Sequence, residues 1–163
     1  KQFVADMDAA AHNCLLHYLG NFPEASASVW WKSPLHVVKY ESGQGMGSHS
    51  DNQIELTPSN DFNNEHPLNN SISASIILLA DCEGGELNFA HADISLKPNV
   101  GSVIMYPSNY VGAHEVAPVE GRRVSAVQFF CHGTPKGDTV PDKWYKGMEG
   151  EIQTLLHSGI MTE

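Results

Sequence analysis

The sequence predicts a mainly β domain, a sandwich or barrel, with a helix at each end. Three observations favour this fold class: short runs rich in β-branched and aromatic residues, turn residues between these runs, and helical periodicity at the two ends of the chain. The length of 163 residues, 41% of them hydrophobic, is enough for one well-buried core. We therefore expect a single domain over residues 1–163.

The first expected element is an amphipathic helix over residues 2–19. Its apolar side chains recur at the three- and four-residue spacing of one helix face, and Gly20 marks its end. A weaker helical pattern, interrupted by glycines, covers residues 141–157 near the other end of the chain. These two helices are expected to flank the β region.

Short strands are expected throughout the middle of the chain, because the apolar runs there are bounded by Gly, Pro, Asn or Asp. The runs are LHVVKYE (35–41), SISASIILLA (71–80), GELNFAH (85–91), ISLKP (94–98), SVIMYP (102–107), HEVAPV (114–119) and RRVSAVQFF (122–130). We expect a tight turn around Glu120 and Gly121 to join the last two runs. Residues 56–70, rich in Asn and Pro, lack any periodicity and are expected to form a long loop of the kind that is usually functional or mobile.

Charge and cysteine content disfavour several classes of partner. Nine Lys and Arg against nineteen Asp and Glu give a formal net charge of −10, which repels nucleic acid and anionic lipid. No apolar run approaches the roughly 18 residues that span a bilayer, and no secretory signal pattern opens the chain. Three scattered cysteines cannot all pair, which favours a reducing compartment. We expect a soluble, cytoplasmic protein, with its oligomeric state left open.

The segment GSHSDNQ, residues 47–53, places a histidine and an aspartate two residues apart. On an extended strand such residues share a face, so the His49 imidazole and the Asp51 carboxylate would lie side by side. The best third partner is His114, because it opens a strand whose start can lie at the rim of a barrel. Two histidines and one carboxylate on one face of an octahedron leave three adjacent positions open on ferrous iron. The three residues are therefore predicted metal ligands and catalytic residues.

The strand that follows His114 carries a second polar pair at the same spacing. Arg123 and Ser125 share a face of this strand, and a guanidinium beside a hydroxyl is suited to a carboxylate. The sequence thus predicts an anion clamp close to the metal. In contrast, His36 and His91 alternate with apolar neighbours and are expected to be structural histidines.

Taken together, these motifs resemble the iron(II)- and 2-oxoglutarate-dependent dioxygenases over about residues 35–131. The HSD pattern, the distal His114, Arg123 nine residues later, GGEL (84–87) and HEVAPV are most similar to the prolyl 4-hydroxylase branch. The resemblance implies a double-stranded β-helix, or jelly roll. It also implies that the three predicted ligands hold Fe(II) at the open end of the jelly roll.

The resemblance further implies how the site works. The co-substrate 2-oxoglutarate would chelate iron while Arg123 binds its far carboxylate, assisted by Ser125 and Tyr40. With O2, the co-substrate would be converted to succinate and CO2 as a substrate C–H bond is hydroxylated, and ascorbate is an accessory of such reactions. The favoured substrate is a prolyl residue in a peptide or protein. Leu78 stands where several prolyl hydroxylases have a tyrosine that binds the far carboxylate.

Two alternatives stay open. A free amino acid or another small metabolite could be the substrate if the 56–70 loop encloses a narrow pocket. The chain could also be a cupin-like metal-binding protein without oxygen chemistry, since GSVIMYPSNYVGAH resembles half of a cupin pattern. However, the first cupin motif requires two histidines and a following glutamate, whereas HSDNQIE supplies an aspartate.

Overall fold

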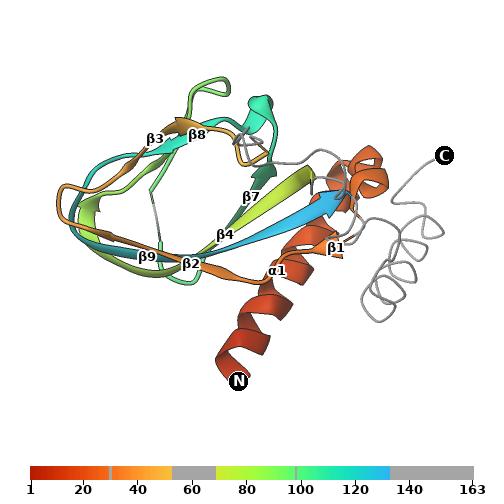
Figure 1. The fold of residues 1–163 in the computed structure, drawn as a ribbon, viewed down its shortest axis with the longest axis horizontal. Helices are drawn as coiled ribbons and strands as arrows, with labels where there is room; N and C mark the ends of the chain where they lie inside the picture. Colours follow the sequence, from red (N-terminus) through yellow and green to blue (C-terminus); the bar gives the residue numbers. More distant parts are fainter. Residues whose placement is uncertain (30, 53–68, 98, 133–163) are drawn as a thin grey trace, which may run out of the picture.

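The structure is a computed structural model that describes residues 1–29, 31–52, 69–97 and 99–132. Two antiparallel β-sheets face each other, and one long helix lies against the outside of the larger sheet (Figure 1). This arrangement is a double-stranded β-helix, so the predicted fold class is confirmed. The helix expected at 141–157 lies outside the described residues, as does the loop expected at 56–70 except for its last two residues, which belong to a strand.

Each of the seven predicted strand runs overlaps a strand, and β4 and β9 extend beyond their runs. β1 and β3 lie outside the predicted runs. The larger sheet contains β1 (Trp31–Lys32), β2 (His36–Glu41), β4 (Asn69–Gly84), β7 (Val103–Pro107) and β9 (Val119–His132). β9 pairs with β4 on one side and with β1 and β2 on the other, and β7 pairs with the far side of β4. The smaller sheet has the order β3 (Met46–His49), β8 (His114–Val116), β5 (Leu87–Phe89) and β6 (Ile94–Leu96). Two short 3-10 helices are η1 (Pro23–Ser28) and η2 (Tyr110–Gly112).

The predicted first helix is confirmed as α1 (Gln2–Asn21). Its buried residues recur every four positions, so one face of the helix packs against the larger sheet. Asp8 on this helix accepts hydrogen bonds from Lys32 and Gln128, which ties the helix to β1 and β9. No helix among the described residues is long and apolar enough to cross a membrane. The core on this side contains Met7, Ala11, Leu15 and Leu19 of α1, Ile72, Ala74 and Ile76 of β4, and Ala126 and Phe130 of β9.

A second core fills part of the space between the two sheets. Because side chains alternate along a strand, β9 contributes to both sides of the larger sheet. Ala126 and Phe130 face α1, whereas Arg123, Ser125 and Val127 face the space between the sheets. The second core contains Tyr40, Leu87, Phe89, Tyr106, Val116 and Val119.

The predicted turn around Glu120 and Gly121 is wrong. Both residues lie inside β9, where they pair with Glu83 and Cys82 of β4. Gly121 has φ +120°, and a Cβ built there would lie 2.3 Å from the backbone oxygen of Asp81. The glycine is therefore required by a close approach of two strands rather than by a chain reversal.

This close approach predicts a large loss of stability for Gly121→Ala. The methyl group would displace β4, and the positive φ adds strain, so we expect the free energy of unfolding to fall by about 3 kcal/mol or more. Gly101→Ala is the matched control, because Gly101 also has a positive φ, but apart from its chain neighbours no atom of the described residues lies within 4 Å of its Cβ position. Its loss should be about 1 kcal/mol. Urea denaturation of both variants measures the difference, and equal losses would contradict the steric explanation.

Candidate active site

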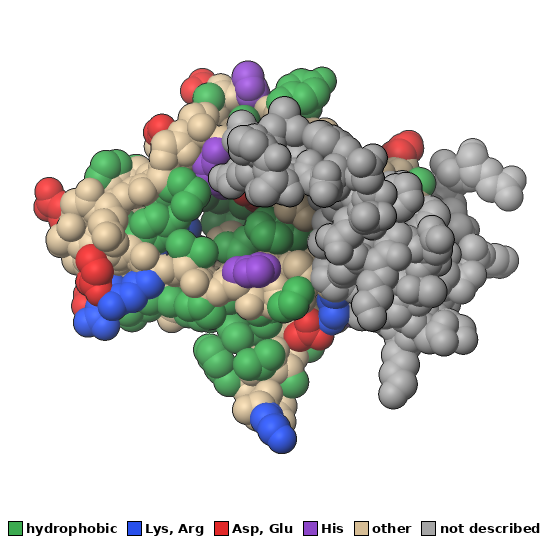
Figure 2. Space-filling model, in the orientation of Figure 1, with side chains coloured by type: hydrophobic (Ala, Val, Ile, Leu, Met, Phe, Trp, Pro, Cys, Tyr) green, Lys and Arg blue, Asp and Glu red, His purple; other side chains and the backbone are tan. Residues whose placement is uncertain are grey.

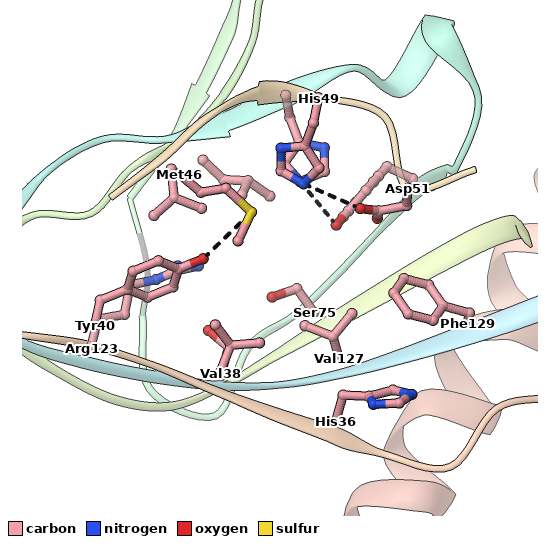
Figure 3. A pocket seen from close by; sticks show the side chains of 15 residues that line it. His36, Val38, Tyr40, Met46, His49, Asp51, Ser75, Arg123, Val127 and Phe129 are labelled. Atoms are coloured by element: carbon pink, nitrogen blue, oxygen red, sulfur yellow. Dashed lines mark hydrogen bonds and ion pairs between the residues drawn. The ribbon is translucent and has the colours of Figure 1, made fainter. Parts of the chain in front are cut away.

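The structure brings His49, Asp51 and His114 together at one end of the smaller sheet. His49 ends β3 and is the cross-strand partner of His114, which begins β8, while Asp51 lies in the turn after β3. One potential ligand atom from each residue lies within 4.8 Å of the others. Nε2 of His49 is 3.4 Å from Oδ1 of Asp51, and the two imidazole centroids are 4.5 Å apart (Figure 3). The side chains of the HSD motif and the distal histidine therefore converge.

A hydrogen bond to the backbone carbonyl two residues earlier orients each of the two imidazoles. Nδ1 of His49 lies 2.9 Å from the carbonyl oxygen of Gly47, and Nδ1 of His114 lies 3.0 Å from that of Gly112. A carbonyl oxygen can only accept, so each Nδ1 carries the hydrogen and donates it. In the neutral rings the lone pair then lies on Nε2, the atom that is available to a metal.

The electrostatics of the three groups differ. The hydrogen bond to Asp51 raises the pKa of His49, whereas burial lowers the pKa of His114. Burial alone would raise the pKa of Asp51, but hydrogen bonds from His49 and Ser73 outweigh it and hold this pKa below its ordinary value. Asp51 is therefore a carboxylate at neutral pH, while one of the two imidazoles holds a proton more readily than the other.

This donor set fits a divalent metal such as iron(II). Two imidazole nitrogens and one carboxylate oxygen are the donors of the facial triad, which leaves further coordination positions open. In addition, Oδ2 of Asp51 is buried and has no hydrogen-bond partner of normal geometry among the described residues. A buried carboxylate oxygen without a partner is costly, and a bound cation would offset that cost.

Competition between protons and metal at these nitrogens predicts a pH dependence. As the pH falls through the raised pKa of His49, its Nε2 takes a proton and the apparent affinity for Co²⁺ should fall by about tenfold per pH unit. His114, with its lowered pKa, should add a second proton only at lower pH, where the slope steepens. Calorimetric Co²⁺ titrations across pH 5 to 8 measure this slope. An affinity independent of pH would contradict ligation by two histidines.

A cavity of about 240 Å³ adjoins the three residues. Figure 2 shows it as a hollow in this face of the molecule, with apolar side chains inside and histidine side chains near its edges. Tyr40 and Arg123 lie at one end of the cavity, and His36 and Phe129 lie at the other (Figure 3). Its lining is His36, Val38, Tyr40, Met46, His49, Asp51, Ser75, Leu87, Tyr106, His114, Val116, Arg123, Ser125, Val127 and Phe129.

Arg123 is a buried cation at the inner end of the cavity. Its side chain is 2% exposed, it forms no ion pair with a carboxylate of the described residues, and its Nε has no hydrogen-bond partner there. Burial lowers the pKa of the guanidinium, which still lies over the ring of Tyr40 with Cζ 5.4 Å from the ring centroid. Gly85 of the GGEL motif makes room for this side chain, since a Cβ there would lie 3.1 Å from Cδ of Arg123. An isolated buried charge of this kind is suited to an anionic ligand.

The other residues predicted for the clamp also lie at this end. Ser125 is buried with no hydrogen-bond partner for Oγ among the described residues, and Tyr40 donates only a long hydrogen bond of 3.9 Å to Sδ of Met46. Leu78 does not line the cavity but packs against the core beside α1. The expectation that His36 is a satisfied structural histidine is wrong, because its side chain is exposed and lines the cavity.

Tyr106 is a site residue that the sequence analysis missed. Its hydroxyl lies 3.4 Å from Nε2 of His114, and its ring packs edge-on against this imidazole with centroids 4.7 Å apart. The hydroxyl also contributes to lowering the pKa of Asp51. Tyr106 lies in the apolar run of β7, and no sequence motif links it to HSD. Its position in the site follows from the pairing of β7 with β4, in which Tyr106 is opposite Ser73.

This contact predicts a role for the Tyr106 hydroxyl in metal affinity. When a metal occupies Nε2 of His114, the phenol is left to donate to Asp51, whose Oδ2 lacks a partner. We expect Tyr106→Phe to weaken Co²⁺ binding by about tenfold or more, as loss of a partner behind a metal ligand commonly does. Tyr110→Phe makes the same chemical change at a side chain that is 74% exposed and should leave the affinity unchanged. Equal affinities for the two variants would refute the role.

Comparisons with known proteins agree with this geometry. A family model described as the 2OG-Fe(II) oxygenase superfamily matches residues 35–131. Among curated proteins, a PKHD-type hydroxylase from Shewanella baltica (strain OS155) is 32% identical over 110 residues, which cover 64% of this chain and 45% of the relative. The chain thus spans about half the length of the curated relatives that it matches.

Solved structures share the fold. A viral collagen prolyl hydroxylase from Paramecium bursaria Chlorella virus-1 superposes with a TM-score of 0.59 at 17% identity, covering 82% of this chain and 70% of that one. A prolyl-4-hydroxylase from Pseudomonas putida superposes with a TM-score of 0.53 at 20% identity, covering 80% and 65%. At these identities the likeness shows a common architecture.

Proposed function

The chain belongs to the 2OG-Fe(II) oxygenase superfamily, as the sequence motifs predict, and from this premise we propose that it is a dioxygenase that hydroxylates a substrate C–H bond. Its cofactor is Fe(II) and its co-substrates are 2-oxoglutarate and O2, with ascorbate as an accessory reductant. One observation carries the proposal. A cluster of two histidines and one aspartate shares a single cavity with a buried arginine that has no carboxylate partner among the described residues.

In this proposal His49, Asp51 and His114 hold the metal. Bound iron(II) supplies the oxygen chemistry, in which 2-oxoglutarate is converted to succinate and CO2 while the substrate C–H bond is hydroxylated. The chain's contribution is to direct both Nε2 atoms toward the metal position, because Nδ1 of each ring donates its hydrogen to the carbonyl oxygen of Gly47 or Gly112. It also keeps Asp51 ionised, because the hydrogen bonds to this carboxylate hold its pKa below the ordinary value.

The inner end of the cavity is the proposed 2-oxoglutarate site. Arg123 donates to the far carboxylate of the co-substrate, and the Ser125 hydroxyl, which lacks a partner among the described residues, assists. The ring of Tyr40 lies under the guanidinium and lines the same end of the cavity. Apolar walls from Leu87 and Val116 keep water from the charge pair, which strengthens it.

The proposed substrate is a prolyl residue in a peptide or protein. Support comes from the similarity to a PKHD-type hydroxylase and from the fold shared with prolyl hydroxylases. The assay that tests the function combines Fe(II), ascorbate and 2-oxoglutarate with proline-containing peptides. It records succinate, together with the gain of one oxygen atom by the peptide in mass spectrometry. Succinate release no greater than that of His49→Ala, with every peptide and without peptide, would refute the proposal.

A further inference from the structure

A pair of buried hydroxyl groups lies beside the Asp51 carboxylate. The Oγ atoms of Ser73 and Ser108 are 2.8 Å apart, and the two residues are 0% and 1% exposed. The Ser73 hydroxyl also forms a hydrogen bond with the Asp51 carboxylate. Neither serine is among the residues that line the cavity. Any effect of this pair on the reaction must therefore be exerted through Asp51.

The direction of these hydrogen bonds follows from the charge of Asp51. A carboxylate can only accept, so Ser73 donates its single hydroxyl hydrogen to Asp51. Ser73 then offers only lone pairs to its other neighbour, and the hydroxyl of Ser108 must be the donor in the contact between the two serines. The result is a directed chain from Ser108 through Ser73 to Asp51. The bonds of such a chain polarise one another, and the bond to the charged end is the strongest.

The backbone around Asp51 is fixed by the same two segments of the chain. The side-chain amide of Asn70 on β4 donates to the carbonyl oxygen of Asp51 at 2.8 Å, and the N–H of Asn52 donates to the carbonyl oxygen of Ser108 at 3.0 Å. Ser108 follows β7 and is itself joined to β4, because its N–H donates to the carbonyl oxygen of Ser71. The turn that carries Asp51 is thus attached to the two segments that supply the hydroxyl pair.

The way in which Asp51 binds a metal decides how many coordination positions stay open. A carboxylate can bind a divalent cation through one oxygen or through both. Three positions stay open beside the facial triad only when its carboxylate uses one oxygen, because the second would take one of them. Oδ1 of Asp51 faces the imidazole of His49 (Figure 3), and Oδ2 is the buried oxygen that lacks a partner of normal geometry among the described residues. When Oδ1 binds the metal, Oδ2 is the oxygen left for Ser73.

Hydroxyl donors on Oδ2 would keep this oxygen away from the metal. A carboxylate oxygen can accept two hydrogen bonds, so Tyr106 and Ser73 together would engage Oδ2 fully. Loss of the Ser73 hydroxyl frees one lone pair, which can then bind the metal. Asp51 would still hold the metal, but one of the positions that 2-oxoglutarate needs would be lost.

We propose that Ser73 is a positioning residue that keeps Asp51 a one-oxygen ligand, and that Ser108 orients the Ser73 hydroxyl for this task. This inference rests on the proposed function and adds to it two residues that touch neither the metal nor the co-substrate. Through Asp51 they preserve the positions at which 2-oxoglutarate chelates the metal. Their loss should therefore weaken the binding of the co-substrate rather than remove the metal.

The mode of 2-oxoglutarate binding tests this role without turnover. The protein is loaded anaerobically with Fe(II) and titrated with 2-oxoglutarate, while calorimetry gives the affinity and absorption spectroscopy records the visible band of the Fe(II) keto-acid chelate. In Ser73→Ala we expect the 2-oxoglutarate dissociation constant to rise by about tenfold or more. The chelate band should stay weaker than in wild type even at saturation. The affinity for Co²⁺ should fall by less than about a hundredfold.

Three further variants separate positioning from a general loss of structure. Ser108→Ala should shift the same readouts in the same direction but less. The double variant should not exceed Ser73→Ala, because Ser108 acts through Ser73. Ser33→Ala is the matched control, since Ser33 is 8% exposed and its Oγ accepts a hydrogen bond of 3.0 Å from the N–H of Phe129. This variant also loses a buried hydroxyl, but it should keep the wild-type affinity and chelate band.

The outcomes separate this inference from the proposed function. A chelate band and a 2-oxoglutarate affinity equal to wild type in Ser73→Ala overturn the positioning role, while the wild-type protein still supports the dioxygenase. Equal losses in Ser73→Ala and Ser33→Ala, or additive losses in the double variant, also overturn it. So does a Co²⁺ affinity reduced more than about a hundredfold in Ser73→Ala, because the serine would then hold the ligand in place rather than select its binding mode. A wild-type protein that binds neither 2-oxoglutarate nor metal overturns the proposed function itself.

Discussion

Replacing His114 by alanine is expected to abolish turnover and to weaken metal binding by more than about a hundredfold. Loss of a partner behind a metal ligand already costs 10- to 100-fold in affinity, so loss of the ligand itself must cost more. The buried imidazole of His114 presents Nε2 to the same point as Nε2 of His49, and its removal leaves one nitrogen and one carboxylate there. His49→Ala should behave in the same way.

Calorimetry with Co²⁺ and the succinate assay measure the two effects independently. His91→Ala is the control, because it removes an exposed imidazole outside the cavity. Added free imidazole should partly restore Co²⁺ binding in His114→Ala by occupying the space that the side chain leaves. Metal affinity within a few fold of wild type would show that His114 is not a ligand.

Replacing Arg123 by methionine is expected to weaken 2-oxoglutarate binding but to leave metal binding intact, in contrast to His114→Ala. Truncating one partner of a buried charge pair costs 2 kcal/mol or more, so the dissociation constant for 2-oxoglutarate should rise by about 30-fold or more. The affinity for Co²⁺ should be unchanged, since the guanidinium makes no metal bond. Calorimetry with each ligand gives both values.

The same variant should not be less stable than wild type in the absence of 2-oxoglutarate. Arg123 keeps a charge buried without a carboxylate partner among the described residues, and methionine fills similar volume without that cost. The free energy of unfolding is therefore expected to be unchanged or to rise by about 1–3 kcal/mol. Arg122→Met, at the exposed neighbouring position, should change neither property. Marked destabilisation by Arg123→Met would indicate that the arginine has a structural role instead.

Much of the architecture can be predicted from local patterns. Buried side chains recur every three or four residues in α1 and alternate in β2 and β9, as the geometry of helices and strands requires. Both patterns can be recognised in the sequence without knowledge of distant contacts. The convergence of the HSD motif with His114 cannot be recognised from a local sequence pattern. Its prediction depended on placing the start of the His114 strand at the rim of a barrel, and in the structure it depends on the pairing of β3 with β8.

The errors have a common physical origin in contacts between distant segments. Gly121 looks like a turn residue, but it is a glycine because the Asp81 backbone approaches it. Tyr106 and His36 look like ordinary members of apolar runs, yet the face that each presents is decided by the register with another strand. Short β3 was outside the predicted runs because MGSH contains no β-branched residue.

The two-sided character of β9 has a consequence for how this protein can diversify. Side chains of β9 that line the cavity alternate with side chains that pack toward α1. Neighbouring residues of this strand therefore have different structural roles. Substitutions at Val127 and Phe129 would change the shape of the cavity, whereas Ala126 and Phe130 pack in the core beside α1. We therefore expect substitutions on the cavity side of β9 to leave the packing of α1 largely unchanged.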